Sequence, residues 1–183
     1  VEDNKKIKKK TSFYYNIDDA NDKKHDHIIF HFKNSLKLIY NDVRKFGFIK
    51  FDLINKLEDN SHLSILGPEP LKKRFDFKYF KNYIKGKNRT IKNLLMDQKF
   101  VSGLGNIYVN EILFYSNVRP TRTINKLRDF EIKNMVKNTK KILKKAIRLG
   151  GSSIKNFSSS NGKTGTFQQY FGIYGKNRKQ CSN

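Results

Sequence analysis

The segment from Thr90 to Pro120, TIKNLLMDQKFVSGLGNIYVNEILFYSNVRP, constrains the fold more than any other stretch of this chain. Apolar residues recur at helical spacing in its first part, which predicts a helix with one apolar face: Ile91, Leu94 and Leu95. Gly103 and Gly105 then permit backbone angles that other residues resist, so we expect a sharp double turn. Asn106 is a suitable N-cap for a second helix that runs to about Ser116. The segment therefore predicts two helices joined by a tight turn.

This layout has a physical use. A helix N-terminus carries free N–H donors and partial positive charge, which together form a ready site for one phosphate group. The two glycines let the backbone approach that phosphate closely, and Lys92 lies on the neighbouring helix. A packed helical hairpin whose glycines only make a turn is the alternative interpretation, and the pattern by itself leaves both open.

The chain is strongly basic, with 39 Lys and Arg against 16 Asp and Glu and a net charge of +23. A charge of this sign and size indicates a polyanionic partner, most simply nucleic acid. Lys, Asn and Ile are all abundant, as a low-GC genome would produce, so part of the excess is solvated surface. No apolar run is long enough to span a membrane, and no secretory signal is visible. The single cysteine excludes an intrachain disulfide framework and fits a reducing cytoplasm.

The first part of the chain predicts a sheet. Residues 1 to about 23 are charged and low in apolar content, which indicates a mobile terminus or a surface insertion. Residues 27–32 and 36–40 read as strands on either side of a turn, and residues 46–54 supply a further strand.

The second part predicts mainly helices. The two prolines of Leu66–Leu71 (LGPEPL) form a stiff linker, followed by a helix and a basic connector. Asp129–Leu149 is an amphipathic helix ended by two glycines; its lysine-rich face is solvated surface first and a weak DNA surface second. Gly151–Thr166 is rich in Ser, Gly and Asn and predicts a flexible loop, and Phe167–Tyr174 predicts a strand.

At this point the residues carry a resemblance. LLMDQKFVSGLGNIYVNEILF resembles the helix–two-turn–helix of formamidopyrimidine-DNA glycosylase, a bacterial DNA repair family, and GLGNIY is closer to it than to its relative endonuclease VIII. Other motifs resemble the same family in the same order: KHDHIIFHF at Lys24–Phe32, NDVRKFG at Asn41–Gly47, LGPEPL, GGSSIKNF at Gly150–Phe157 and GKTGTFQQYFGIYG at Gly162–Gly175. The resemblance covers nearly everything from Lys24 to Cys181.

The resemblance implies an α+β fold with four parts. Residues 1–66 would form part of an N-terminal β-sandwich behind a basic, disordered start, and residues 67–73 would be the linker. Residues 74–149 would be the helix–two-turn–helix DNA-binding domain. Residues 150–183 would hold the lesion-recognition loop and the start of a truncated zinc-finger hairpin.

The resemblance also implies DNA contacts. It assigns phosphate or backbone contacts to four residues: His25, Lys87, Lys92 and Asn106. Arg44 and Phe46 match the family residues that enter the duplex where the damaged nucleotide leaves, although Val43 stands where the family usually has proline and Lys45 where it usually has arginine. We expect the remaining polar groups nearby to be structural, with turn or network roles: Asp26, His27, His31 and Asp42.

In the family, the loop after the long helix closes over the flipped lesion. Ser152, Ser153, Ile154 and Lys155 stand in that register. Cys181 matches the first cysteine of a C-terminal zinc finger that normally has two C-x2-C pairs. Structural zinc needs four ligands, so we expect zinc in the intact protein and none bound by this chain.

The family removes oxidised purines such as 8-oxoguanine and formamidopyrimidine by covalent amine catalysis. An N-terminal proline attacks the sugar, an adjacent glutamate and a lysine move protons, and elimination cuts the strand. None of these catalytic residues matches a position here, and the register places Val1 well inside the family's N-terminal domain. We therefore expect a bifunctional DNA glycosylase/AP lyase as the parent, and an inactive fragment that keeps the binding and flipping groups.

The resemblance implies a monomer that acts on double-stranded DNA containing oxidised purines, in the cytoplasm of a bacterium and at its nucleoid. Two other function classes stay open. A non-catalytic helix–two-turn–helix protein, as among ribosomal proteins, would bind nucleic acid without regard to lesions. A basic scaffold would bind polyanions by charge alone, with a steep dependence on salt.

Overall fold

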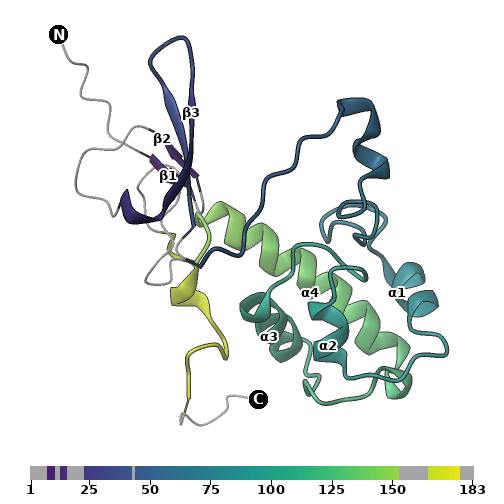
Figure 1. Ribbon diagram of the computed structural model, residues 1–183. Helices are drawn as coiled ribbons and strands as arrows, with labels where there is room; N and C mark the ends of the chain where they lie inside the picture. Colours follow the sequence, from purple (N-terminus) through teal and green to yellow (C-terminus); the bar gives the residue numbers. More distant parts are fainter. Residues whose placement is uncertain (1–7, 11–12, 16–22, 43, 153–164, 178–183) are drawn as a thin grey trace. The chain divides into compact units, whose positions relative to one another are not determined.

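The structure is a computed structural model, and it describes residues 8–10, 13–15, 23–42, 44–152 and 165–177 (Figure 1). The chain divides into two compact units. The first joins Val1–Phe51 to Ala146–Gln169, and the second joins Asp52–Lys145 to Tyr170–Asn183. Helices and strands are both present, as the α+β prediction requires.

The first unit contains a four-stranded antiparallel sheet in the order β1-β2-β4-β3. Its strands are β1 (Lys8–Lys10), β2 (Phe13–Tyr15), β3 (Asp26–His31) and β4 (Lys37–Asn41). The hairpin of β3 and β4 confirms the predicted strand pair, and Ser35 in its turn has a positive φ of 60°. The described residues supply one sheet, so the second layer of a sandwich stays a prediction.

One prediction for this part of the chain is narrowed and another was wrong. Residues 8–10 and 13–15 form strands, and β2 pairs with Leu38–Tyr40 of β4, so for these residues the predicted surface insertion fits and the mobile terminus does not. The strand predicted over residues 46–54 is absent, and a 3-10 helix, η2 (Ile54–Asp59), begins at its end. Alternating phenylalanines gave the strand pattern, but pairing needs a neighbouring strand, and the structure describes none there.

Beyond the long helix α4 (Asp129–Arg148), two chain segments approach each other closely at Gly151, Ser152 and Gly165, which are called the neck below. Gly150 and Gly151 have positive φ values of 73° and 83° and end the helix as predicted, with the Gly151 N–H donating to the Ala146 carbonyl at 2.8 Å. Ser152 and Thr166 then form a β-bridge. A Cβ on Gly165 would lie 2.1 Å from the Gly151 carbonyl oxygen, so only glycine permits this approach.

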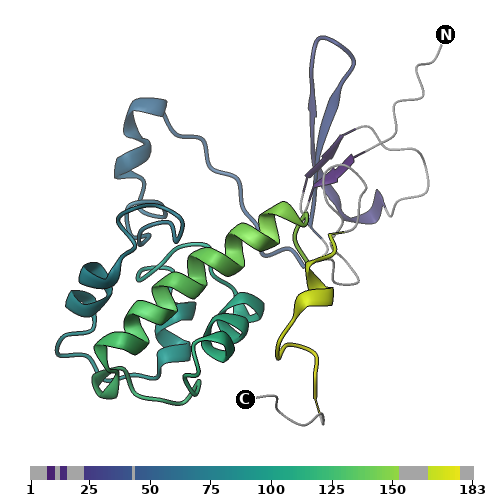
Figure 2. The ribbon, with the colours of Figure 1, turned by 180° about the vertical axis from the view of Figure 1, so that it is seen from behind.

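The second unit is helical. Its helices are α1 (Phe77–Tyr83), α2 (Ile91–Met96), α3 (Asn106–Tyr115) and most of α4, together with the 3-10 helices η2 and η3 (Ile124–Lys126). α2 and α3 lie on one side of α4, which is behind them in Figure 1 and in front of them when the view is reversed in Figure 2. The helix–double turn–helix prediction is therefore confirmed.

Aromatic side chains fill the core between α1 and the double turn. Phe75, Phe80 and Phe100 are fully buried, and the rings of Phe80 and Phe100 meet edge to face with centroids 4.9 Å apart. The Tyr79 hydroxyl donates to the Phe100 carbonyl at 2.8 Å. Gly67, in the predicted linker, lies against this carbonyl, and a Cβ there would come within 2.4 Å of its oxygen. The beginning of the linker is thus packed onto the helical unit.

The long helix has one buried and one exposed face. Glu131, the third residue of the helix, caps its N-terminus: its carboxylate accepts from the Arg128 N–H at 2.7 Å, as an acidic side chain at the third helical position often does. Four residues of the predicted apolar face are buried: Ile132, Met135, Ile142 and Ala146. Ile147, which has the same helical spacing, is 65% exposed because it lies at the edge of this face, near the helix end.

Candidate nucleic-acid interface

The double turn between α2 and α3 is held by one side chain that the sequence reading missed. Gln98 accepts from the Gly103 N–H at 2.6 Å and donates to the Leu104 carbonyl at 2.9 Å. Gly103 has a φ of +81°, as expected for a glycine that reverses the chain. One amide side chain therefore satisfies backbone groups of two successive turn residues, and a Gln that follows a helix and precedes a G-x-G pair is the signal for it.

The N-terminus of α3 is open. The N-cap is Gly105, in an ordinary extended conformation, and no side chain caps the helix. The prediction of Asn106 as N-cap was wrong, since Asn106 is already the first helical residue and its side-chain oxygen accepts from Asn110 at 3.2 Å. The first N–H groups of a helix lack partners within it. A Cβ on Gly105 would meet nothing within 4 Å, so the approach to this end of α3 is clear.

Two charged residues brace α2 against the turn. The Arg89 guanidinium donates to the Asp97 carboxylate at 2.8 Å and to the Asn93 carbonyl at 2.9 Å. Burial raises the pKa of Asp97, but the bonds from Arg89 and from the Lys99 N–H outweigh it, and the pKa lies below its usual value. Arg89 therefore has a structural role.

The two predicted lysine contacts of this unit lie just before α2 and in its first turn. Lys87 is exposed, and its ammonium lies 3.2 Å from the centroid of the Tyr83 ring. Lys92, in the first turn of α2, is half-buried. With the start of α3, these residues are the candidate phosphate contacts of the second unit.

In the first unit, Asp42 organises the segment that follows β4. Its carboxylate accepts from the N–H groups of Arg44 and Lys45 at 3.0 Å each, and from Gly47 at 2.7 Å. The Tyr40 hydroxyl also donates to it, at 2.9 Å. The Gly47 bond contributes most to holding the pKa of Asp42 below its usual value. The prediction that Asp42 is a turn carboxylate is confirmed.

The turn brings together the two residues predicted to enter the duplex. The Arg44 guanidinium stacks over the Phe46 ring, 4.5 Å from its centroid, and the Phe46 side chain is 77% exposed. The carbonyl of His25 accepts from the Asp42 N–H at 3.0 Å, which ties the end of η1 (Lys23–His25) to the same turn. On such a hydrogen-bonded turn, the exposed ring can insert between bases, and the guanidinium above it can donate hydrogen bonds.

Glu111 is a second residue that the sequence reading did not assign. It is fully buried on α3, and its carboxylate accepts from the N–H groups of Gly172, Ile173 and Tyr174 at 2.6 to 3.1 Å. The strand predicted over residues 167–174 was therefore wrong. Its first residues form a 3-10 helix, η4 (Phe167–Tyr170), and the N–H groups after it bind a carboxylate instead of a neighbouring strand.

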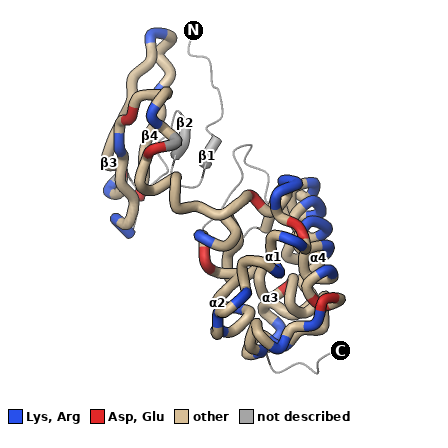
Figure 3. The backbone as a smooth tube through the Cα atoms, turned by 90° about the vertical axis from the view of Figure 1, so that its right-hand side faces the viewer, with Lys and Arg blue, Asp and Glu red and all other residues tan. Residues whose placement is uncertain are grey.

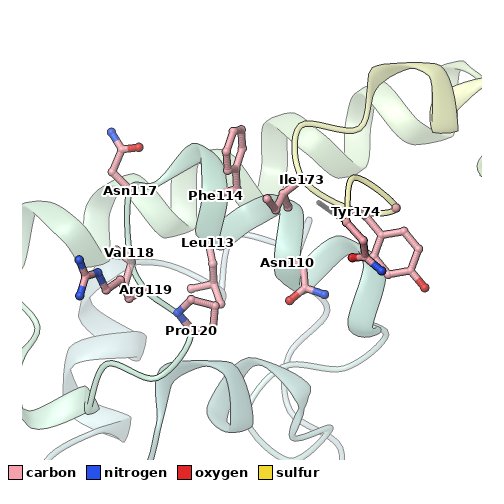
Figure 4. A pocket seen from close by; sticks show the side chains of 11 residues that line it. Asn110, Leu113, Phe114, Asn117, Val118, Arg119, Pro120, Ile173 and Tyr174 are labelled. Atoms are coloured by element: carbon pink, nitrogen blue, oxygen red, sulfur yellow. The ribbon is translucent and has the colours of Figure 1, made fainter. Parts of the chain in front are cut away.

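A pocket of about 1040 Å³ lies between α3 and this anchored segment (Figure 4). Apolar side chains from both sides line it, and its polar lining comes from Asn110, Asn117, Arg119, Tyr174 and Asn177. No carboxylate, histidine or lysine is among the lining residues. The pocket therefore offers shape and a single positive charge rather than acid–base groups.

Several predicted positions lie outside the described residues: Ser153, Ile154, Lys155 and Cys181. Ser152 is described, and it forms the bridge at the neck. Within the described parts of the chain, no group of three or more His, Cys, Asp or Glu could hold a metal ion. Nor does any helix there have the length and apolar character that crossing a membrane requires.

Comparison with known proteins agrees with the helical geometry. Residues 66–158, about half of the chain, match the formamidopyrimidine-DNA glycosylase H2TH domain. The enzyme of that name from Listeria monocytogenes EGD-e is 45% identical over 160 residues, which are 86% of this chain and 58% of the relative. The one from Rickettsia felis is 40% identical over 161 residues, 88% of this chain and 58% of the relative. This chain thus spans a little over half the length of these curated relatives.

Solved structures give the same result. A mutant of Lactococcus lactis FPG in complex with Fapy-dG containing DNA is 36% identical, with a TM-score of 0.83, and the match covers 98% of this chain and 64% of that one. The MutM (FPG) protein from Thermus thermophilus is 25% identical with a TM-score of 0.81, over 96% of this chain and 73% of that one. With an open helix end after a double glycine turn and these matches along its length, the chain belongs to the formamidopyrimidine-DNA glycosylase family.

Proposed function

We propose that the intact protein is a bifunctional DNA glycosylase and AP lyase of base excision repair that removes oxidised purines such as 8-oxoguanine and formamidopyrimidine. Family membership supports this proposal, as does the Fapy-dG containing DNA bound by the Lactococcus lactis relative. It would act as a monomer on double-stranded DNA at the bacterial nucleoid. The observation in this chain that carries the proposal most directly is the uncapped start of α3 behind Gly105.

The described residues would divide the binding work. In the helical unit, the first N–H groups of α3 would hold one phosphate, with Asn106, Lys87 and Lys92 around it. In the sheet unit, His25 would contact a phosphate. Extruding a nucleotide costs a few kcal/mol of stacking and pairing. The Phe46 ring would replace lost stacking, while the Arg44 guanidinium would hydrogen-bond the orphaned base.

We further propose that these 183 residues do no chemistry by themselves. The family's proline, glutamate and lysine catalysts match no residue of the sequence. In the same proposal, the intact protein binds structural zinc as the family does, and these residues alone do not. A structural zinc site needs four ligands, and the sequence has one cysteine, Cys181. The loop containing Ser152 would close over the flipped lesion.

The test compares the affinity of this chain for duplexes containing 8-oxoguanine or guanine. We expect tighter binding to the lesion, and Arg44→Ala and Phe46→Ala should each reduce that preference. Arg74→Ala, at an exposed arginine of the helical unit, is the charge-matched control and should leave the preference unchanged. Equal affinity for both duplexes would instead favour a non-catalytic nucleic-acid-binding protein.

Borohydride trapping tests the second claim. A Schiff base between an amine of this chain and the sugar would be reduced to a covalent adduct. We expect none with the 8-oxoguanine duplex, and an adduct would show that an amine within these residues can serve as the nucleophile.

A further inference from the structure

Helix α4 carries a line of four lysines on the face opposite its core. Lys137, Lys140, Lys141 and Lys144, called the basic stripe below, follow each other at spacings of three, one and three residues. At 3.6 residues per turn they fall within an arc of about 100°, centred roughly opposite the buried side chains of the same helix. Three of them are exposed and Lys140 is half-buried. Figure 3 shows successive Lys and Arg positions along α4.

The acidic residues of α4 lie away from the stripe. The carboxylates of α4, Asp129 and Glu131, lie in its first turn. Asp129 pairs with Lys81 at 2.7 Å, and Glu131 is within 3.6 Å of two arginines. Lysines three or four residues apart on a helix repel one another. The stripe therefore weakens its own helix unless a polyanion lies against it.

Two other lysines of α4 contact aromatic rings of the helical unit and so have a structural role. Lys133 lies over the Phe77 ring at 5.1 Å, and Lys145 lies over the Tyr170 ring at 3.7 Å. No ion pair or ring contact of this kind accompanies the four stripe lysines among the described residues. They span about 10 Å at 1.5 Å per residue, and duplex DNA presents a phosphate charge about every 1.7 Å of its axis.

We propose that the basic stripe is a second, sequence-independent contact for the phosphate backbone of duplex DNA, separate from the start of α3. The stripe lies on the face of α4 opposite its buried side chains, whereas α2 and α3 lie together on one side of α4 (Figures 1 and 2), so we place the stripe on a different DNA segment from the start of α3. The protein then bridges two duplexes. A membrane surface fits less well, because the apolar face of α4 is already buried in the core and cannot enter lipid. This inference rests on DNA being the partner proposed above.

The test immobilises a short 8-oxoguanine duplex, loads this chain on it, and measures capture of a second, labelled duplex without a lesion. The stripe variant replaces the four lysines by glutamine, which keeps helix propensity. The control variant replaces four exposed lysines elsewhere in the unit, so that both lose the same charge: Lys72, Lys73, Lys78 and Lys126. Circular dichroism of each variant verifies that the helices are retained.

We expect the stripe variant to lose capture about tenfold, with a shallower dependence of capture on salt, while the control variant keeps it. Equal losses in both variants would overturn the proposal in favour of net charge alone. Both variants are also tested for binding to anionic phospholipid vesicles. Undiminished DNA capture by the stripe variant would overturn the proposal, and a loss of its vesicle binding at the same time would favour a membrane surface as the partner. Absence of any lesion preference in the first binding step bears on the proposed function instead, because capture of the second duplex does not require a lesion.

Discussion

At the scale of one residue, a substitution at Gly105 can separate an effect on folding from an effect on DNA binding. Its φ and ψ of −118° and 172° suit any residue, and a Cβ there meets open space. We predict that Gly105→Ala leaves the unfolding midpoint unchanged but weakens DNA binding about tenfold, near the 1.5 kcal/mol of one hydrogen bond to a charged group. Fluorescence anisotropy and thermal melts measure the two effects.

Gly103→Ala is the companion variant. With a φ of +81°, this position strains any residue with a side chain, so alanine here should lower the melting temperature itself. If Gly105→Ala also melted early, or bound DNA as tightly as the original chain, the clear approach to α3 would have no role in binding.

Asp42 gives a pH prediction. Its folded pKa lies below the usual 3.8, mainly through the Gly47 N–H bond. The carboxylate therefore stabilises the turn above about pH 3.8, and this contribution is lost as the pH falls through the lower folded value. We predict that the amide resonances of Arg44, Lys45 and Gly47 shift together only in that acidic range. In Asp42→Asn this common titration should be gone, and its persistence would assign it to another group.

At the scale of elements, Glu111 joins α3 to the segment after η4. Three backbone N–H groups converge on one buried carboxylate, so replacing it by an amide puts a donor where only an acceptor fits. We predict that Glu111→Gln destabilises the helical unit by about 1–3 kcal/mol. The amides of residues 172–174 should also lose protection in hydrogen exchange.

Asn110→Asp is a useful control, since it alters a neighbouring, half-buried position of α3 without touching these bonds. Protection of residues 172–174 that survived Glu111→Gln would mean that the carboxylate is not what holds the segment.

The elements that the sequence revealed are those stabilised by their own pattern. α4 and α2 show helical periodicity, and the β3–β4 hairpin has alternation around a turn. The errors occurred where a partner decides the outcome. Phe46 and Phe48 alternate as in a strand, yet no strand forms over residues 46–54, and the N–H groups of residues 172–174 go to Glu111. Gln98 was overlooked because its partners, the Gly103 N–H and the Leu104 carbonyl, lie five and six residues along the chain, outside the helix and strand periodicities that were used.

At the scale of the whole chain, the two units differ in how much apolar surface they bury. The helical unit has fully buried residues on α2 and α3 and an aromatic cluster around Phe100. In the sheet unit, Ile28, Ile29 and Phe32 of the β3–β4 hairpin are 38 to 53% exposed. We predict weak hydrogen-exchange protection in β3 and β4 and strong protection in α2, α3 and α4.

Truncation variants are not needed for this experiment, because one exchange time course on the full chain compares both units. Strong protection throughout residues 27–53 would contradict the prediction and would show that the sheet is stable with the strands it has.

The neck formed by Ser152, Gly165 and Gly151 bears on how changes of chain length beyond α4 affect the fold. The β-bridge holds Ser152 beside Thr166, so two chain positions that are 14 residues apart in sequence meet at one point of the fold. The entropy of closing a segment between two such positions grows only slowly with its length, by about 0.6 kcal/mol per doubling. A change in the number of residues between Ser152 and Gly165 should therefore have little effect on the stability of α4.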